Sequence, residues 1–358
     1  MADLPNTNET AEKLNSEFAK DVLPVTVFVG ILACVGFLGN VLVLYVFSFK
    51  YHKCNYKYFV LFLALIDLTS CLTTMPGEMV TQSFWYTYPV PEICKAKTFF
   101  NVFTVCSSAL CLLLIAIDRY RKICKPSEWQ MRPKMAIFLC ICALIIAGIV
   151  ATPIAILWGI QNYNNTNYNV NVTSCETDDK YKDTEYPLIY SSTIDVIIAI
   201  PMIVMAVLYS LIACEIRRSR QNARATSSNT TDTADENAPL ISTSQRASTT
   251  PSFKTDTVEK NVQLQSPLSD QEYPQIERKT LIMFISSATF IITTILYLTL
   301  LSKIASNILD KLTDDERVVY FFFFRFYFIH HAINPFVYAF LDVHFKEALR
   351  EMTCGIHN

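Results

Sequence analysis

The sequence predicts an all-α membrane protein: a seven-transmembrane helix bundle followed by a short amphipathic eighth helix. Of the 358 residues, 52% are apolar and only 17% are charged, whereas a soluble domain of this size carries more charge. The apolar residues gather in seven runs, each reaching roughly the 20 residues that a helix needs to cross the hydrocarbon core. These runs are 22–49, 58–81, 97–117, 135–160, 188–213, 281–301 and 318–340.

The runs predict helices and not strands. Backbone groups in lipid must be hydrogen-bonded within the protein, and these runs lack the alternation of apolar and polar residues that barrel strands show. The net charge of -2 says nothing about partners, because in a membrane protein the distribution of charge matters more than its sum. We expect membrane lipid as a partner and no nucleic acid.

The distribution of basic residues predicts an extracellular N-terminus. With that orientation, the cytoplasmic segments carry 20 Lys and Arg and the outer segments carry 9, as the positive-inside rule requires. The glycosylation sequons at Asn8, Asn164 and Asn171 then lie outside, whereas the one at Asn229 faces the cytosol and stays bare. The expected location is the plasma membrane.

Five regions follow from this topology. They are the extracellular N-terminus (1–21), helices 1–5 with their loops (22–217), a disordered third cytoplasmic loop (218–275), helices 6 and 7 (276–340), and an amphipathic helix 8 with the tail (341–358). The third loop is rich in Ser, Thr, Asn and Asp and has no apolar periodicity. In the tail, apolar residues recur at helical spacing, which predicts a helix lying on the membrane.

The cysteines predict one disulfide. There are 12 in the chain, but only Cys94, at the outer end of the third run, and Cys175, in the second outer loop, lie in oxidising space. Two cysteines in the same oxidising compartment are expected to pair. The others read as free thiols packed as small apolar groups.

Two motifs carry functional information. The third run ends in Asp118-Arg119-Tyr120, and the seventh contains Asn334-Pro335 followed by Tyr338. Charged residues at a helix end often only mark the membrane border, but that reading leaves the second motif unexplained. A proline within a membrane helix frees a carbonyl and bends the helix, and a neighbouring asparagine satisfies what is freed.

Together these motifs resemble those of rhodopsin-like (class A) G-protein-coupled receptors, from residue 22 to about residue 353. Further matching features are Gly39-Asn40, the run Leu63 to Asp67, the 25-residue spacing from Cys94 to Arg119, Pro201, Tyr209 and Phe345. The sixth run departs from the family, since Phe290 is followed by Thr293 and Thr294 without the usual tryptophan and proline. The fourth run lacks its tryptophan, with Ala143 near that depth, and Ser127 stands where a bulky apolar residue is usual.

The resemblance implies a receptor and not an enzyme. Its partners would be an extracellular ligand, a heterotrimeric G protein, arrestin and receptor kinases. Arg119 would pair with Asp118 at rest and turn toward Tyr209 and Tyr338 in the active state. The implied switch residues are Asp118, Arg119, Tyr120, Tyr209, Asn334, Pro335 and Tyr338.

The resemblance also implies a polar core around Asp67. The matching aspartate of the family holds a sodium ion with partners that correspond to Asn40, Ser108 and Asn334. The alternative is a polar network that only pins helices together. No other cofactor is expected.

The ligand is less well defined. Asn101 stands where amine receptors carry an aspartate, and the seventh run has no lysine for retinal. The predicted ligand-binding residues are Lys97, Asn101, Phe321 and Arg325. Arg325 would meet a ligand carboxylate, or else form a structural ion pair with Glu78 or Asp195.

We expect a peptide ligand, with a small carboxylate or a lipid acid as the alternative. Two other classes of function stay open. A seven-helix transporter is disfavoured because the two halves of the chain share no motif. A constitutive or purely structural partner stays open because the sixth run lacks its usual motif.

Overall fold

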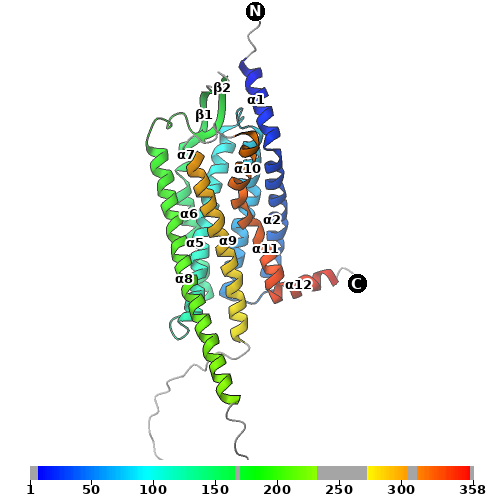
Figure 1. Cartoon of the computed structure of the whole chain (residues 1–358), viewed down its shortest axis with the longest axis vertical. Coiled ribbons are helices and arrows are strands. Elements are labelled where there is room, and N and C mark those ends of the chain that lie inside the picture. The colour runs from blue at the N-terminus through cyan, green and yellow to red at the C-terminus, as the bar shows by residue number, and fades with distance from the viewer. Residues whose placement is uncertain (1–6, 166–169, 232–271, 305–312, 355–358) are drawn as a thin grey trace, which may run out of the picture.

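The computed structural model describes residues 7–165, 170–231, 272–304 and 313–354. They form a bundle of long helices lying side by side (Figure 1). The elements are α1 (Thr7–Asp21), α2 (Leu23–Phe49), α3 (Asn55–Thr69), α4 (Met75–Ser83), α5 (Pro91–Cys124), α6 (Pro133–Ala151), α7 (Ile154–Leu157), β1 (Trp158–Asn165), β2 (Val170–Thr177), α8 (Tyr186–Thr231), α9 (Glu272–Ile304), α10 (Asp314–Arg325), α11 (Ile329–Leu341) and α12 (Val343–Cys354).

The predicted membrane spans are confirmed, with one of them interrupted. In the described part of the chain, six helical stretches are long and apolar enough to cross a membrane. The seventh predicted span is built from α10, a 3₁₀ turn at Phe326–Phe328, and α11. Because the turn divides it, neither α10 nor α11 reaches the length of a span by itself.

The second span contains a π-helical turn at Ser70–Thr74, which joins α3 to α4. Pro76 lies at the start of α4 and has no backbone N–H to donate. A widened turn is one way to accommodate a missing hydrogen bond in a helix. It also sets the rotation of α4, the helix that carries Glu78.

The outside of the bundle is apolar and its interior mixes apolar with polar groups. Large apolar side chains such as Leu38 on α2 and Ile149 on α6 are more than 60% exposed, as lipid-facing residues are in a membrane protein. The interior contains the fully buried Phe47, Leu112 and Met205. It also contains buried polar residues on several helices, which mark the functional regions described below.

At one end of the bundle, α1 and the β1–β2 hairpin lie above the helices (Figure 1). The strands are antiparallel and pair Trp158 with Thr177 and Asn164 with Asn171. The sequence placed 158–160 in the fourth helix, and this was wrong. The apolar run continues there, but α6 and α7 end before it and the backbone is paired in the hairpin instead.

The N-terminal helix α1 was not foreseen. Ala11 and Leu14 on α1 pack against Val170 and Val172 of β2. The Asn15 side chain donates to the Ser83 carbonyl at 2.9 Å and accepts from the backbone N–H of Tyr86 at 3.0 Å. These contacts hold α1 against the ends of α4 and β2.

At the opposite end of the bundle, the start of the predicted third loop is helical instead, whereas the predicted eighth helix is present. The helix α8 continues to Thr231, past the expected boundary at 217, and 232–271 lie outside the described residues. The short helix α12 lies across the end of the bundle (Figure 1). Its Phe345 and Ala348 are buried, and its N-terminus is capped where the Phe345 N–H donates to Asp342 Oδ1 at 3.1 Å.

Candidate functional site

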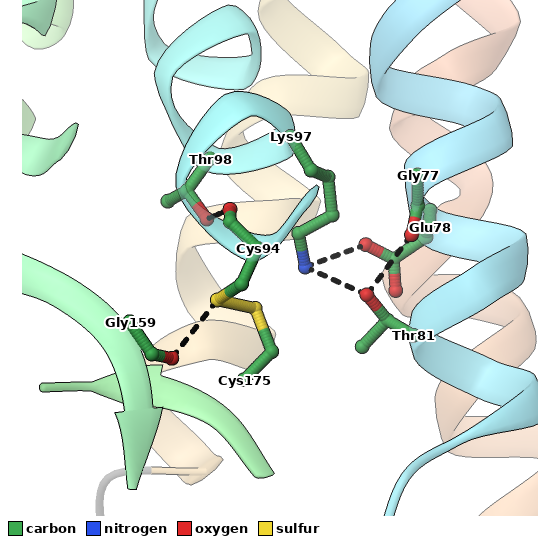
Figure 2. Close-up of a disulfide and its surroundings, with 8 residues drawn as sticks. All are labelled: Gly77, Glu78, Thr81, Cys94, Lys97, Thr98, Gly159 and Cys175. Atoms are coloured by element: carbon green, nitrogen blue, oxygen red, sulfur yellow. Dashed lines mark hydrogen bonds and ion pairs between the residues drawn. A yellow bond between two sulfur atoms is a disulfide. The ribbon is translucent and has the colours of Figure 1, made fainter. Parts of the chain in front are cut away.

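A disulfide and a charge cluster lie together at the end of the bundle that carries the β1–β2 hairpin. Cys94 of α5 is bonded to Cys175 of β2, with their Cα atoms 5.6 Å apart, so the predicted pairing is confirmed. Figure 2 shows Lys97, one turn further along α5, reaching toward α4. There its Nζ lies 3.4 Å from Glu78 Oε2 and donates to the Thr81 hydroxyl at 3.1 Å.

Glu78 joins the two cations that the sequence singled out. Arg325 donates to Oε1 of Glu78, while Lys97 lies at Oε2. The sequence left open whether Arg325 pairs with Glu78 or Asp195, and the structure places it on Glu78; Asp195 is exposed. Within the described residues the Glu78 carboxylate is shared by both cations, and Glu176 of β2 is a second acid that interacts electrostatically with Lys97.

Aromatic rings surround Arg325. Its guanidinium carbon lies 4.4 Å from the Phe324 ring centre and 5.5 Å from that of Phe321, within the range of a cation–π attraction. The Tyr327 hydroxyl donates to Asn101 Oδ1 at 3.0 Å. The predicted ligand residues on α5 and α10 therefore lie in one region, and Asn101 joins it through Tyr327.

Phe18 of α1 lies over this region, which the sequence analysis missed. Its ring centre is 5.1 Å from that of Trp85 and 5.7 Å from that of Phe321, and only 4% of Phe18 is exposed. A signal was present, since Ala11, Leu14 and Phe18 are spaced as one face of a helix. It was overlooked because the first 21 residues are mostly polar.

The polar core connects three of its four predicted members. Asn334 Nδ2 donates to Asp67 Oδ2 at 2.8 Å. Asn40 Nδ2 donates to the His331 carbonyl at 2.9 Å, and His331 Nδ1 lies 2.8 Å from Asp67 Oδ1. The Ser108 hydroxyl has no hydrogen-bond partner among the described residues. His331 was missed, although the pair of histidines in the seventh run was a visible signal.

The sodium ion implied by the resemblance stays a prediction, but the residues as they are arranged do not fit one. A hard cation needs the oxygen lone pairs of its carboxylate. Both oxygens of Asp67 already face N–H donors, from His331 and Asn334. The Ser108 hydroxyl and the amide oxygens of Asn40 and Asn334, all buried without partners in the described part of the chain, would suit a cation. The carboxylate that supplies the charge does not.

At the end of the bundle opposite the hairpin, Arg119 lies against the adjacent Asp118. Asp118 also accepts hydrogen bonds from Asn55 Nδ2 at 2.7 Å and Lys122 Nζ at 3.0 Å. Both residues of the pair are at most 3% exposed. Asn55 on α3 and Arg119 and Lys122 on α5 therefore all donate to the Asp118 carboxylate and hold it in place.

The other predicted switch residues lie in or beside the core, and within the described residues the side chain of Arg119 is hydrogen-bonded to Asp118 and not to them. Tyr209 and Ser287 share a hydrogen bond of 3.1 Å between their hydroxyls. Tyr338 is buried and packs against Phe47 and Phe345. Pro335 packs closely against α2, because a Cβ atom added at Gly39 would lie only 2.7 Å from Cγ of Pro335. Tyr120 packs at the edge of the main core.

The helices and the buried polar groups along them define a multi-pass membrane protein with a charge cluster at one end, a polar core, and a buried arginine–aspartate pair at the other end. The model of the 7 transmembrane receptor (rhodopsin family) matches residues 39–338. The chain belongs to this family, whose members are receptors and not enzymes.

Individual relatives include receptors that are named for different kinds of ligand. Bombesin receptor subtype-3 of Ovis aries is 28% identical over 229 residues, covering 61% of this chain and 56% of the relative. Vasopressin V1b receptor of Mus musculus is 26% identical over 221 residues, covering 60% and 50%. 5-hydroxytryptamine receptor 2B of Dichotomyctere fluviatilis is 31% identical over 185 residues, covering 50% and 38%. The chain thus spans about half or less of the length of these relatives.

Proposed function

We propose that this protein is a plasma-membrane receptor that binds an extracellular ligand through an anionic group and activates a heterotrimeric G protein. The favoured ligand is a peptide with a free carboxylate. The N-terminus lies outside the cell, and arrestin and receptor kinases are the expected further partners. The single observation that carries the ligand chemistry is the cluster of Arg325, Lys97 and Glu78.

A buried donor left unpaired in this cluster favours an anion. Glu78 contacts both cations, and the side chains of Lys97 and Arg325 are 14% and 4% exposed. Arg325 Nε has no hydrogen-bond partner among the described residues, so one buried donor is left over. Leaving a buried donor unpaired is costly, and a carboxylate would satisfy it with a charge-assisted hydrogen bond.

The same cluster disfavours an amine, although some relatives are named as amine receptors. A ligand cation would add a third positive charge beside two that share one carboxylate. Asn101 on α5 offers an amide oxygen, not a carboxylate, and that oxygen already accepts from Tyr327. A small carboxylate or a lipid acid shares the anionic chemistry and is the alternative ligand.

The proposal is tested in cells that express the receptor with a promiscuous G protein. Peptide pools with free C-termini, the same pools with amidated C-termini, a panel of fatty acids and a panel of biogenic amines are compared. We expect a response to a carboxylate-bearing pool that amidation weakens and that Arg119→Ala abolishes. A response to the amine panel alone would overturn the ligand chemistry. A response that survives Arg119→Ala would overturn the proposed route to the G protein.

A further inference from the structure

The carboxylate of Asp67 is held on both of its oxygens by side chains of α11. His331 Nδ1 lies 2.8 Å from Oδ1, and Asn334 Nδ2 donates to Oδ2 at 2.8 Å. Asp67 and His331 are both fully buried. An ionised carboxylate can only accept, so beside the Asp67 carboxylate the hydrogen of this contact is carried by Nδ1.

The position of His331 is fixed by its backbone as well as its ring. Its carbonyl accepts from Asn40 Nδ2 at 2.9 Å, and the same amide group donates to the Gly36 carbonyl at 2.9 Å. The helices approach closely here, since a Cβ on Gly36 would lie 3.4 Å from the Cβ of Ala332. The backbone of α11 is therefore held against α2 at the residue that carries the imidazole.

The ring of His330 packs against the His331 imidazole. The ring centres of His330 and His331 are 3.7 Å apart, and the His330 ring is in turn 5.2 Å from that of Phe290 on α9. His331 is thus enclosed between Asp67 and a stack of rings. A cation that approached Asp67 Oδ1 would have to displace an enclosed side chain.

We propose that the His331 imidazole takes the place of a sodium ion in the core of this receptor. A buried carboxylate must be stabilised by a counter-ion or by hydrogen-bond donors. A free cation does this by binding and dissociating, whereas His331 supplies an N–H donor that is covalently part of α11. The core then joins α3 to α11 at all times, and the receptor does not respond to sodium.

The first test compares the purified receptor in sodium chloride and in choline chloride at equal ionic strength. Two quantities are measured: the melting temperature, and the ligand-free nucleotide exchange of an added G-protein heterotrimer. We expect both to be the same in the two salts. A saturable rise of the melting temperature with sodium that Asp67→Asn removes would overturn the proposal.

The second test asks whether sodium sensitivity can be created. His331→Ser removes the ring and leaves a hydroxyl oxygen next to Asp67, so this variant should gain a saturable sodium-dependent rise in melting temperature. Adding Asp67→Asn to it should abolish the gain. His331→Phe is the matched control, because it removes the N–H donor but keeps a ring in the same space, and it should gain nothing.

Each outcome of the second test decides the matter. A His331→Ser variant that folds and ignores sodium would overturn the claim that the imidazole is what excludes the ion. An equal gain in His331→Phe would overturn the claim that the ring blocks the carboxylate. If His331→Ser does not accumulate at the cell surface, His331→Thr is used in its place, because it also removes the ring and supplies a hydroxyl oxygen.

Discussion

Gly77 of α4 lies directly against the stem of Lys97 on α5. A Cβ atom on Gly77 would be 2.7 Å from Cγ and 2.8 Å from Cβ of Lys97, closer than side chains pack. The missing side chain lets Lys97 pass α4 and reach Glu78 and Thr81 (Figure 2). The absence of a side chain at Gly77 thereby allows the positive charge of Lys97 to join Glu78 and Arg325.

Gly77→Ala should therefore displace Lys97 from Glu78. We expect a loss of about 1–3 kcal/mol in the free energy of unfolding, which is usual for an overpacked contact, and a weaker response to any carboxylate-bearing peptide pool. The melting temperature of the purified receptor and the potency of that pool are the measurements. The control is Gly148→Ala, since nothing lies within 4 Å of a Cβ at Gly148. Equal losses in both variants would contradict the prediction.

The ion pair between Glu78 and Arg325 predicts a coupled pair of mutations. Glu78→Gln leaves the buried Arg325 without its carboxylate, so it should lose about 3–5 kcal/mol of stability. Arg325→Met alone should cost less, because Lys97 still neutralises Glu78. The double variant should be more stable than Glu78→Gln alone. A double-mutant cycle on unfolding measures this, and strictly additive losses would show that the two residues are not coupled.

The same variants separate the structural role of Arg325 from a role in ligand binding. If Arg325 binds a ligand anion, the double variant should regain surface expression but not potency toward the carboxylate-bearing pool. Arg325→Lys should restore only part of the potency, since an ammonium lacks the planar fork of donors. Recovery of expression and potency together would assign Arg325 to structure alone.

The inner switch predicts opposite effects for adjacent residues. Arg119→Ala should abolish nucleotide exchange on the G protein while surface expression stays close to that of the unmodified receptor. Asp118→Asn should raise basal exchange, because it removes the charge on which Arg119 rests. Asn55→Ala offers a milder test, since it removes only one donor to Asp118. Full signalling by Arg119→Ala would contradict the assignment.

A lysine on α9 predicts a second restraint at the cytoplasmic end. Within the described residues Arg119 pairs with no acid of α9, but Lys279 Nζ lies 5.8 Å from the ring centre of Tyr51 and 5.5 Å from that of Tyr56. Both tyrosine hydroxyls donate to Asp342 Oδ2 at 2.9 Å. This arrangement holds α9 against the junction of α11 and α12.

Lys279→Met should therefore raise basal nucleotide exchange by about two- to fivefold, as expected from the loss of a cation–π contact of about 0.5–1 kcal/mol. Ligand-free exchange in membranes is the measurement. Its exposed neighbour supplies the matched control, because Arg278→Met removes the same charge one position away. A similar rise in both variants would indicate a general effect of charge and not this contact.

The hairpin predicts the outer topology. Asn164 and Asn171 lie opposite each other on β1 and β2, and both are exposed. We expect glycan on at least one of them, so glycosidase should change the gel mobility of the receptor and the variant with both changed to Gln should change less. If glycosidase has no effect and Cys94 and Cys175 react with thiol reagents before reduction, the predicted orientation is wrong. Asn8 lies where side chains are not described, so its sequon stays a prediction.

The features that could be predicted from the sequence depend on short stretches of chain or on the side of the membrane where a residue lies. The length of the apolar runs determined the helices, because a lipid-exposed backbone must satisfy its own hydrogen bonds. The basic residues indicated the orientation, and the resulting compartments singled out Cys94 and Cys175. The boundaries were less accurate, as the strand at 158–160 shows, because apolar composition does not distinguish a helix end from a buried hairpin.

The sequence by itself therefore determined the class of the protein, its spans, its disulfide and the motifs of its switch. Only the tertiary structure decided that Arg325 rests on Glu78, that Lys97 passes Gly77 to join them, and that His331 lies against Asp67. The physical reason is the rotation of each helix about its axis. Membrane helices are apolar on most sides, so no local pattern states which residues face one another. The π-helical turn in the second span and the 3₁₀ turn in the seventh change that rotation further.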